Sequence, residues 1–270
     1  MCRVLSVSVG GFYAWMKRPA SMREREDGEL SKHITRIYQQ HQGRYGSPRI
    51  HQQLRDEGVQ IGYKRVVRLM KRAKLVARYR THRLVTTRAD PTAPPAENVL
   101  DRDFEAEAPN QKWVCDVTYI ATAAGWLYLA AVLDLYSRRV VGWAMAPRQD
   151  EQLVHQALGM AVRLRKPGTG LLHHSDRGCQ YTSQAYQTYL KELDIHISMS
   201  RKGNCWDNAV MERFFGTVKR ECTAQMNFLT HQEARTALFE YIEAYYNRAR
   251  KHSTLGYVSP VQFELANCRR

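Results

Sequence analysis

Beyond residue 110, three apolar segments rich in β-branched and aromatic residues follow one another with short polar breaks, near residues 113–120, 126–133 and 139–146. Such runs predict consecutive β-strands. Four further elements are expected behind them: a helix near 151–165 capped by Asp150, a strand at 170–175, a helix near 183–193 and a strand near 195–198. Strands followed by alternating helices and strands restrict this region to an α/β structure in which helices cover a mixed sheet.

Three acidic residues occupy unusual positions in this pattern. Asp116 stands inside the strand-like run VCDVTYI, where burial of a carboxylate is unfavourable unless it is paired, protonated or bound to a cation. Asp176 follows a short apolar run, at the carboxyl end of a predicted strand. Glu212 lies on a helix expected to begin near residue 207, with 35 residues between it and Asp176. If the fold gathers the three, their hard oxygen ligands suit magnesium or manganese.

Ordinary structural roles compete with this interpretation, because an Asp at a strand end is more often a cap or a turn former than a metal ligand. Asp134 also follows an apolar run, and we expect it to be a turn or salt-bridge residue. Asp207 stands at the start of a predicted helix, where we expect it to cap backbone N–H groups. His173 and His174 adjoin Asp176 and are expected to pack or to support metal ligands from outside.

Positive charge is concentrated in the first third of the chain. Residues 1–88 hold 20 Lys and Arg against 6 Asp and Glu, whereas residues 89–270 hold 21 against 20. This asymmetry indicates a nucleic-acid-binding module joined to a second module of nearly balanced charge.

The basic region has the pattern of a helical DNA-binding motif. Helices are expected at 28–41, from Pro48 to Gly58 with Ser47 as N-cap, and at 63–75. In the last of these, apolar residues can pack inward while basic residues stay outside, as in a helix-turn-helix whose second helix contacts DNA. The expected DNA-contacting residues are Lys64, Arg65, Arg68, Lys71 and Arg72. The alternative is a basic solvated helical domain without a recognition helix. The sequence does not decide whether these side chains read bases or contact only phosphates.

Five ordered segments carry a more specific signal. They are PNQKWVCDVTYI (109–120), LAAVLDLYSRRVVGW (129–143), HSDRGCQYT (174–182), RKGNCWDNAVMERFFGTVK (201–219) and YNRARKHSTLGYVSPVQFE (246–264). Together they resemble orfB, the catalytic subunit of bacterial insertion-sequence transposases, whose core is shared with retroviral integrases. The resemblance covers nearly the whole chain, and the YGSPRI segment matches a motif in the basic region. It implies a ribonuclease H-like mixed five-stranded sheet flanked by helices, preceded by an all-α helix-turn-helix domain.

The resemblance also implies a site and a reaction. The family's DDE triad falls on Asp116, Asp176 and Glu212, which would hold two Mg²⁺ or Mn²⁺ ions. A basic residue seven positions after the Glu is matched by Lys219, expected on the same helix face as Glu212. Asn208, one turn before Glu212, is expected to contact DNA. The implied enzyme is a polynucleotidyl transferase that cuts one strand at the element's end and joins the freed 3′-hydroxyl to target DNA.

Implied partners are the element's terminal inverted repeats, target DNA, a second copy of the chain and the orfA product, separate or fused. The expected location is the bacterial cytoplasm in association with DNA, because no signal peptide or membrane-length apolar run is visible in the sequence. Six cysteines without a C-x-x-C pair argue against a disulfide framework or a zinc site. Two alternatives remain: a ribonuclease H-like nuclease or resolvase that cuts without joining, and a non-catalytic DNA-binding regulator.

The expected organisation has five parts. They are an N-terminal segment resembling the remnant of a helix-turn-helix (1–26), the basic helix-turn-helix domain (27–88), an acidic Pro- and Ala-containing linker (89–108), the catalytic core (109–228) and a C-terminal helical extension of that core (229–270).

Overall fold

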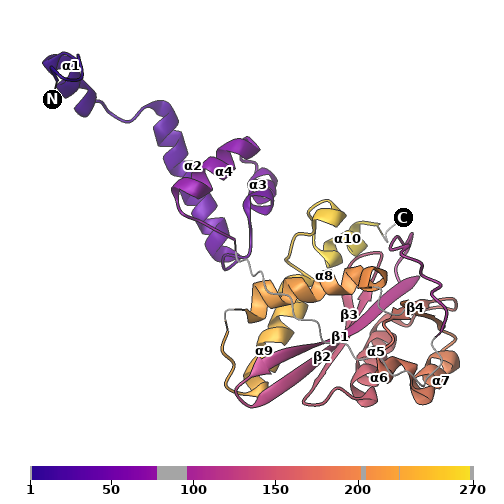
Figure 1. The fold of residues 1–270 in the computed structure, drawn as a ribbon. Helices are drawn as coiled ribbons and strands as arrows, with labels where there is room; N and C mark the ends of the chain where they lie inside the picture. Colours follow the sequence, from indigo (N-terminus) through magenta and orange to yellow (C-terminus); the bar gives the residue numbers. More distant parts are fainter. Residues whose placement is uncertain (1, 78–95, 202–204, 225, 268–270) are drawn as a thin grey trace. The chain divides into compact units, whose positions relative to one another are not determined.

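The computed structural model describes residues 2–77, 96–201, 205–224 and 226–267 (Figure 1). The chain divides into two compact units, with the boundary between Arg78 and Tyr79. The last part of the expected helix-turn-helix domain, residues 78–88, and the first part of the expected linker, residues 89–95, lie outside the described residues.

The first unit is helical, as its sequence predicts. Its helices are α1 (Val9–Met16), α2 (Met22–Gln40), α3 (Ser47–Asp56) and α4 (Tyr63–Arg72). Helix α2 begins six residues before the expected position, because Ser21 and Glu24 form a reciprocal capping box that the sequence analysis overlooked. Helix α3 takes Gly46 as its N-cap in place of Ser47.

Helices α2, α3 and α4 share one small core, built from Ile34, Ile37, Tyr45, Ile50, Leu54, Val66, Leu69 and Met70. The inward residues expected on α4 are therefore confirmed, except that Ala73 lies beyond the helix and is exposed. Asp27 is the one acidic residue buried on α2, at 3% exposure. A carboxylate can stay ionised there only with cationic partners, which α4 supplies.

The second unit contains the predicted five-stranded mixed sheet. Its strands are β1 (Lys112–Thr122), β2 (Gly125–Asp134), β3 (Val140–Ala146), β4 (Leu172–Ser175) and β5 (His196–Met199). They lie in the order β3-β2-β1-β4-β5, with β1, β2 and β3 antiparallel and β4 and β5 parallel to β1. The three consecutive strands followed by two parallel ones give the expected ribonuclease H-like arrangement.

Helices cover both faces of the sheet (Figure 1). Helices α5 (Glu151–Arg165), α6 (Cys179–Thr182) and α7 (Gln184–Glu192) share a core with Trp113 and Cys115. Helices α8 (Ala209–Val218) and α9 (His231–Phe239) share the other core with Val114 and Ile120. Asp150 caps α5 as predicted, since its carboxylate accepts a hydrogen bond from the Leu153 backbone N at 3.0 Å. Helix α5 packs close to β3 at Gly142, where a Cβ atom would collide with the Ala157 carbonyl oxygen.

Asp134 has the structural role expected of it. Its carboxylate is fully buried at the end of β2 and accepts hydrogen bonds from the backbone N of Tyr136 at 2.8 Å and of Asn110 at 2.7 Å. The Trp113 indole N–H donates to it as well, at 3.3 Å. These donors keep a buried carboxylate satisfied and shape the turn after β2.

The C-terminal extension packs on the core. After α8 the chain forms a π-helical turn (Lys219–Thr223), then α9, a second π-helical segment (Glu240–Tyr246), a 3₁₀ turn (Ser253–Leu255) and α10 (Pro260–Asn267). Glu221 and Arg250 form a buried bidentate ion pair, at 2.8 Å for both bonds. The Arg165 guanidinium bonds Glu264 of α10, at 2.8 and 2.9 Å. These pairs anchor the middle of the extension and its last helix to the core.

Part of the expected linker also belongs to this unit. Leu100 is 2% exposed and lies in the α8-side core. The Met199 backbone N donates to the Glu97 carbonyl at 3.1 Å, and the Leu100 backbone N donates to Ser198 Oγ at 3.0 Å. Residues from 96 onward are thus packed beside β5, the edge strand of the sheet. Composition suggested an extended spacer because acidic, proline and alanine residues outnumber Leu100 and Phe104, the large apolar residues that pack on the core.

Candidate active site

Asp116 and Asp176 come together through strand register. Strands β1 and β4 are parallel, with Val114 opposite His174. Two residues further along each chain, Asp116 is level with Asp176, which directly follows the end of β4 at Ser175. Asp116 points to the same side of β1 as Val114, because side chains two residues apart share a face. That is the side covered by α8, which carries Glu212.

The charge of Asp116 is unfavourable in this position. Its side chain is half-buried, and the only hydrogen bond recorded for it among the described residues comes from the Val117 backbone N, at 2.7 Å. Burial raises the pKa of the Asp116 carboxyl well above its usual range, and the negative charges of Asp176 and Glu212 raise it further. The Lys219 ammonium opposes this effect. The Asp116 carboxyl therefore responds to the charges of both other predicted acids.

Asp176 has a similar environment. Its side chain is half-buried and accepts a hydrogen bond from the Gly178 backbone N at 2.9 Å. Burial raises the pKa of its carboxyl, and the Gly178 bond offsets part of that rise. Two neighbouring carboxylates that both resist ionisation form a site where a cation would be favourable.

Glu212 and Lys219 are the other two predicted site residues, and both lie on the helical segment that covers this side of β1. Glu212 lies on the first turn of α8 with an exposed side chain. Lys219 begins the π-helical turn that follows α8, and its ammonium lies 4.6 Å from the centre of the Tyr119 ring on β1. Helix α8 is continuous through Val218, so every residue between Glu212 and Lys219 is α-helical, and Lys219 lies close enough to influence the pKa of Asp116.

The donor set fits a hard divalent cation in its chemistry, since it consists of carboxylate oxygens with raised proton affinity at Asp116 and Asp176. In the part of the chain that the structure describes, no three His, Cys, Asp or Glu side chains form a group close enough to hold a metal as they stand. The two aspartates are positioned by strand register, whereas Glu212 has a long side chain that is exposed.

Asn208 joins α8 to β1. It is buried at the N-cap of α8, and its Nδ2 donates to the Cys115 carbonyl at 3.2 Å, one residue before Asp116. In the described part of the chain, its buried Oδ1 has no hydrogen-bond partner, which is unusual in a folded protein. The side chain that was expected to contact DNA is thus buried between α8 and β1 in this structure.

His173 and His174 have supporting roles, as expected. Both are fully buried on β4. His173 Nε2 lies 3.0 Å from the Tyr186 hydroxyl, and His174 bonds Ser198 and Ser200 at 2.8 and 3.1 Å. Burial lowers the pKa of His173 to about 3 and that of His174 to about 4, so both rings are neutral at physiological pH.

Asp207 is not the helix cap that its position suggested. It is fully buried and accepts hydrogen bonds from Arg201, through the backbone N and the guanidinium, from Arg102 at 2.9 Å and from Asn98 at 3.0 Å. The Arg201 bonds hold the pKa of its carboxyl well below its usual range. Sequence reasoning missed this cluster because two of its members precede Asp207 by about a hundred residues, and no local pattern joins them.

In the first unit, the basic residues of α4 fall into two sets. Arg65 Nε and Arg68 both bond the buried Asp27 carboxylate at 2.8 Å, and Arg65 also bonds Glu26. Lys64, Lys71 and Arg72 are exposed. Of the five residues expected to contact DNA, two are therefore held in internal ion pairs that orient α4, and three project to solvent.

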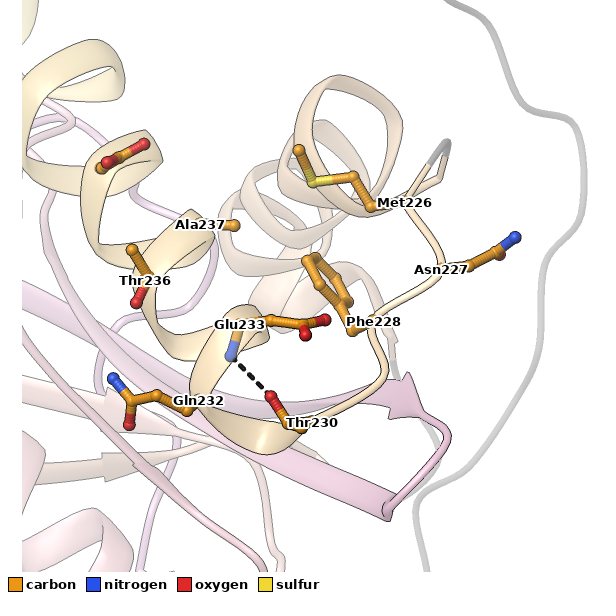
Figure 2. Close-up of a pocket in the computed structure, with 9 residues that line it drawn as sticks. Met226, Asn227, Phe228, Thr230, Gln232, Glu233, Thr236 and Ala237 are labelled. Carbon is orange, nitrogen blue, oxygen red and sulfur yellow. Dashed lines mark hydrogen bonds between the residues drawn. The ribbon is translucent and has the colours of Figure 1, made fainter.

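The second unit also contains a pocket of about 550 Å³ (Figure 2). Its lining residues come from the start of α9 and the segment before it, namely Met226, Asn227, Phe228, Thr230, Gln232, Glu233, Thr236, Ala237 and Glu240. None of these is a predicted site residue. The Thr230 hydroxyl caps α9 by accepting a hydrogen bond from the Glu233 backbone N at 3.1 Å.

Comparisons with known proteins agree with this architecture. A family model described as "Integrase core domain" matches residues 106–205, and a second model of the same description matches residues 193–260. A model described as "HTH-like domain" matches residues 24–83. No helix in the described ranges is both long enough and apolar enough to span a membrane.

Relatives match along nearly the whole chain. The "Insertion element IS600 uncharacterized 31 kDa protein" of Shigella sonnei is 41% identical over 263 residues, 97% of each chain. "Transposase InsF for insertion sequence IS3A" of Escherichia coli (strain K12) is 41% identical over 280 aligned positions, 99% of this chain and 93% of the relative. Among solved structures, the simian T-cell lymphotropic virus intasome with PP2A regulatory subunit B56 gamma matches with a TM-score of 0.49 and 15% identity, covering 85% of this chain and 73% of that one. From the near full-length relatives, the chain belongs to the insertion-sequence transposases that include those of IS3 and carry an integrase core and an HTH-like domain.

Proposed function

We propose that Asp116, Asp176 and Glu212 form the metal-binding triad of this transposase and that two Mg²⁺ or Mn²⁺ ions bind between them. The observation that carries the proposal is the parallel β1–β4 register, which sets Asp116 level with Asp176 on the sheet face that α8 and Glu212 cover. The raised pKa of both aspartates, caused first by burial, is consistent with it. A magnesium-bound solved structure, the "HTLV-2 integrase catalytic core domain in complex with magnesium", supports only the choice of ion.

The bound ions would activate a water or a DNA 3′-hydroxyl and stabilise the leaving oxygen during displacement at phosphorus. The two aspartates hold their places through the β1–β4 register, so little reorganisation is needed there. Lys219 brings a cation beside the carboxylates and is suited to hold a DNA phosphate. Asn208, through its bond to the Cys115 carbonyl, is suited to hold the start of α8, and so Glu212, beside Asp116. The neutral His174 is suited to support Asp176 through Ser200, which donates to the Ser175 carbonyl, without adding charge.

The substrate proposed is the element's own terminal inverted repeat, followed by target DNA. Lys64, Lys71 and Arg72 on α4 would contact the duplex, with Arg65 and Arg68 orienting the helix through Asp27. Pairing of two element ends requires at least two copies of the chain. The orfA product, separate or fused, is the proposed protein partner, and the proposed setting is the DNA of a bacterial cytoplasm.

The test uses full-length protein, labelled element-end DNA and Mn²⁺. Wild type is expected to nick the 3′ end and to join it to target DNA, whereas Glu212→Gln should bind ends normally and lose both products. Glu192→Gln, which neutralises an exposed glutamate at the end of α7, is the matched control and should behave as wild type.

Each alternative has its own outcome in this assay. Nicking without joined products would favour a nuclease or resolvase. End binding that is equal with EDTA, without Mn²⁺-dependent nicking, would favour a non-catalytic regulator. Cleavage retained by Glu212→Gln would remove Glu212 from the triad.

A further inference from the structure

Residues 96–102 form a strap that lies against β5 and the loop that follows it. The Ala96 backbone N contacts the Met199 sulfur at 3.4 Å, and two further hydrogen bonds join Glu97 and Leu100 to β5. Leu100 anchors the strap in the core at 2% exposure. The strap precedes residue 106, where the match to the integrase core begins.

The strap contacts Asp207, which lies in the 3₁₀ turn Cys205–Asn208 just before α8. Asn98 Nδ2 donates to Asp207 Oδ2 at 3.0 Å, and Arg102 Nε donates to Oδ1 at 2.9 Å. Arg201 closes the cluster from the loop after β5 and also bonds Asp101 of the strap at 3.0 Å. Because Asp207 is fully buried and its carboxylate is charged, its position depends on these donors.

From Asp207, a short covalent and hydrogen-bonded path reaches two of the acids. The next residue, Asn208, donates to the Cys115 carbonyl, directly before Asp116. Helix α8 begins at Ala209 and presents Glu212 in its first turn. A shift of Asp207 would therefore move the start of α8 relative to β1, and so Glu212 relative to Asp116.

A second path reaches the remaining acid. Ser198 Oγ, which accepts from the Leu100 backbone N, lies 2.8 Å from His174 Nδ1. On the other side of the ring, His174 Nε2 lies 3.1 Å from Ser200 Oγ, which donates to the Ser175 carbonyl at 3.3 Å. Ser175 directly precedes Asp176. Every group on this path is buried, so its geometry is held without competition from water.

We propose that the strap is a positioning element for the metal-binding carboxylates, with Arg102 and Asp207 as its positioning residues. The inference rests on the proposed function of Asp116, Asp176 and Glu212. It assigns a role in catalytic geometry to a segment whose composition resembles a linker. Loss of the strap contact should loosen the spacing of the acids and weaken metal use before it weakens the fold.

Arg102→Gln in full-length protein is the appropriate variant. Arg102 is 47% exposed and Arg201 remains on Asp207, so the buried carboxylate keeps a cationic partner and the unit should fold. Lys112→Met is the matched control, since it removes the same charge and frees Asp103 and Glu105, just outside the strap. The readouts are the Mn²⁺ concentration for half-maximal nicking of element-end DNA, end binding in EDTA and the melting temperature.

We expect Arg102→Gln to raise the half-maximal Mn²⁺ concentration by about tenfold, the lower end of the effect of removing an outer partner of a metal ligand. Its melting temperature and its end binding should match those of Lys112→Met. Arg102→Lys should recover part of the loss, because an ammonium can still reach Asp207.

Two results would overturn the inference while leaving the proposed function intact. One is wild-type Mn²⁺ dependence in Arg102→Gln, in an experiment where Asp116→Asn is inactive. The other is an equal loss in Arg102→Gln and Lys112→Met, which would show that the strap only maintains the fold. Absence of metal-dependent nicking in wild type would instead refute the proposed function itself.

Discussion

At the scale of single residues, Asp116 shows how a functional group can oppose stability. Its side chain is half-buried, and Asp176 and Glu212 add negative charge nearby, so its pKa in the folded chain is raised. A carboxyl group with a folded pKa above its unfolded value favours the folded state only while it is protonated. Without metal, stability contributed by this site is therefore lost as the pH rises through the raised pKa.

Asp116→Asn should consequently raise the melting temperature of the metal-free protein at neutral pH. The amide oxygen can still accept the Val117 bond while the unfavourable charge is removed. The gain should shrink as the pH falls below the raised pKa, where Asp116 is neutral as well. Thermal melts in EDTA across a pH series check this, with Glu192→Gln as an exposed control; equal or lower melting temperatures for Asp116→Asn at neutral pH would contradict it.

At the scale of elements, α4 depends on a buried acid for its orientation. Asp27 of α2 accepts bonds from Arg65 and Arg68, and the Arg65 bond is the main reason that the pKa of Asp27 is lowered. Two arginines on the helix expected to contact DNA are thus partly neutralised by the protein itself. Arg65 and Arg68 therefore serve mainly to fix how α4 packs against α2, and less as free positive charge.

Asp27→Asn should weaken binding of element-end DNA although it removes a negative charge. Loss of the charged acceptor leaves Arg65 and Arg68 poorly paired, which should lower the free energy of unfolding of the helical unit by about 1–3 kcal/mol. Glu29→Gln is the matched control, because Glu29 pairs with Lys32 on the surface and its loss should change stability by less than about 0.5 kcal/mol. Binding is measured in EDTA; tighter binding by Asp27→Asn would mean that charge outweighs orientation.

At the scale of the whole molecule, charge is divided between two units with different tasks. The first 88 residues carry nearly all of the excess positive charge, and the remainder is close to balanced. Such a division favours strong, salt-sensitive attraction to duplex DNA by the basic first part of the chain.

Replacement of Lys64, Lys71 and Arg72 by Gln should therefore reduce the slope of log K against log salt concentration by about 2–3, since each phosphate contact contributes about 0.9. A triple variant of exposed cations in the catalytic unit, Arg148, Arg163 and Lys191, removes the same charge and should change the slope less. Fluorescence anisotropy with element-end duplex at several salt concentrations measures both. Equal changes would show that the basic face of α4 has no special place in DNA binding.

Much of the fold follows from local patterns. The three apolar runs became β1, β2 and β3, Asp150 caps α5, and Asp134 shapes a turn, because these features depend on residues a few positions apart. The missed start of α2 is also local, since Ser21 and Glu24 form a recognisable capping box. For the site, the acids could be selected by position and by resemblance, but their shared electrostatics come from the β1–β4 register and from α8.

The sequence by itself determined the order of the elements, the division of charge and the three acids on which the chemistry is proposed to depend. Only the tertiary structure decided that Asp207 is a buried ion-pair centre, that Arg65 and Arg68 turn toward Asp27, and that residues 96–102 belong to the core. The physical reason is distance along the chain. The Arg102–Asp207 bond spans 105 residues, and such a contact arises from the packing of whole elements, which no pattern of neighbouring residues records.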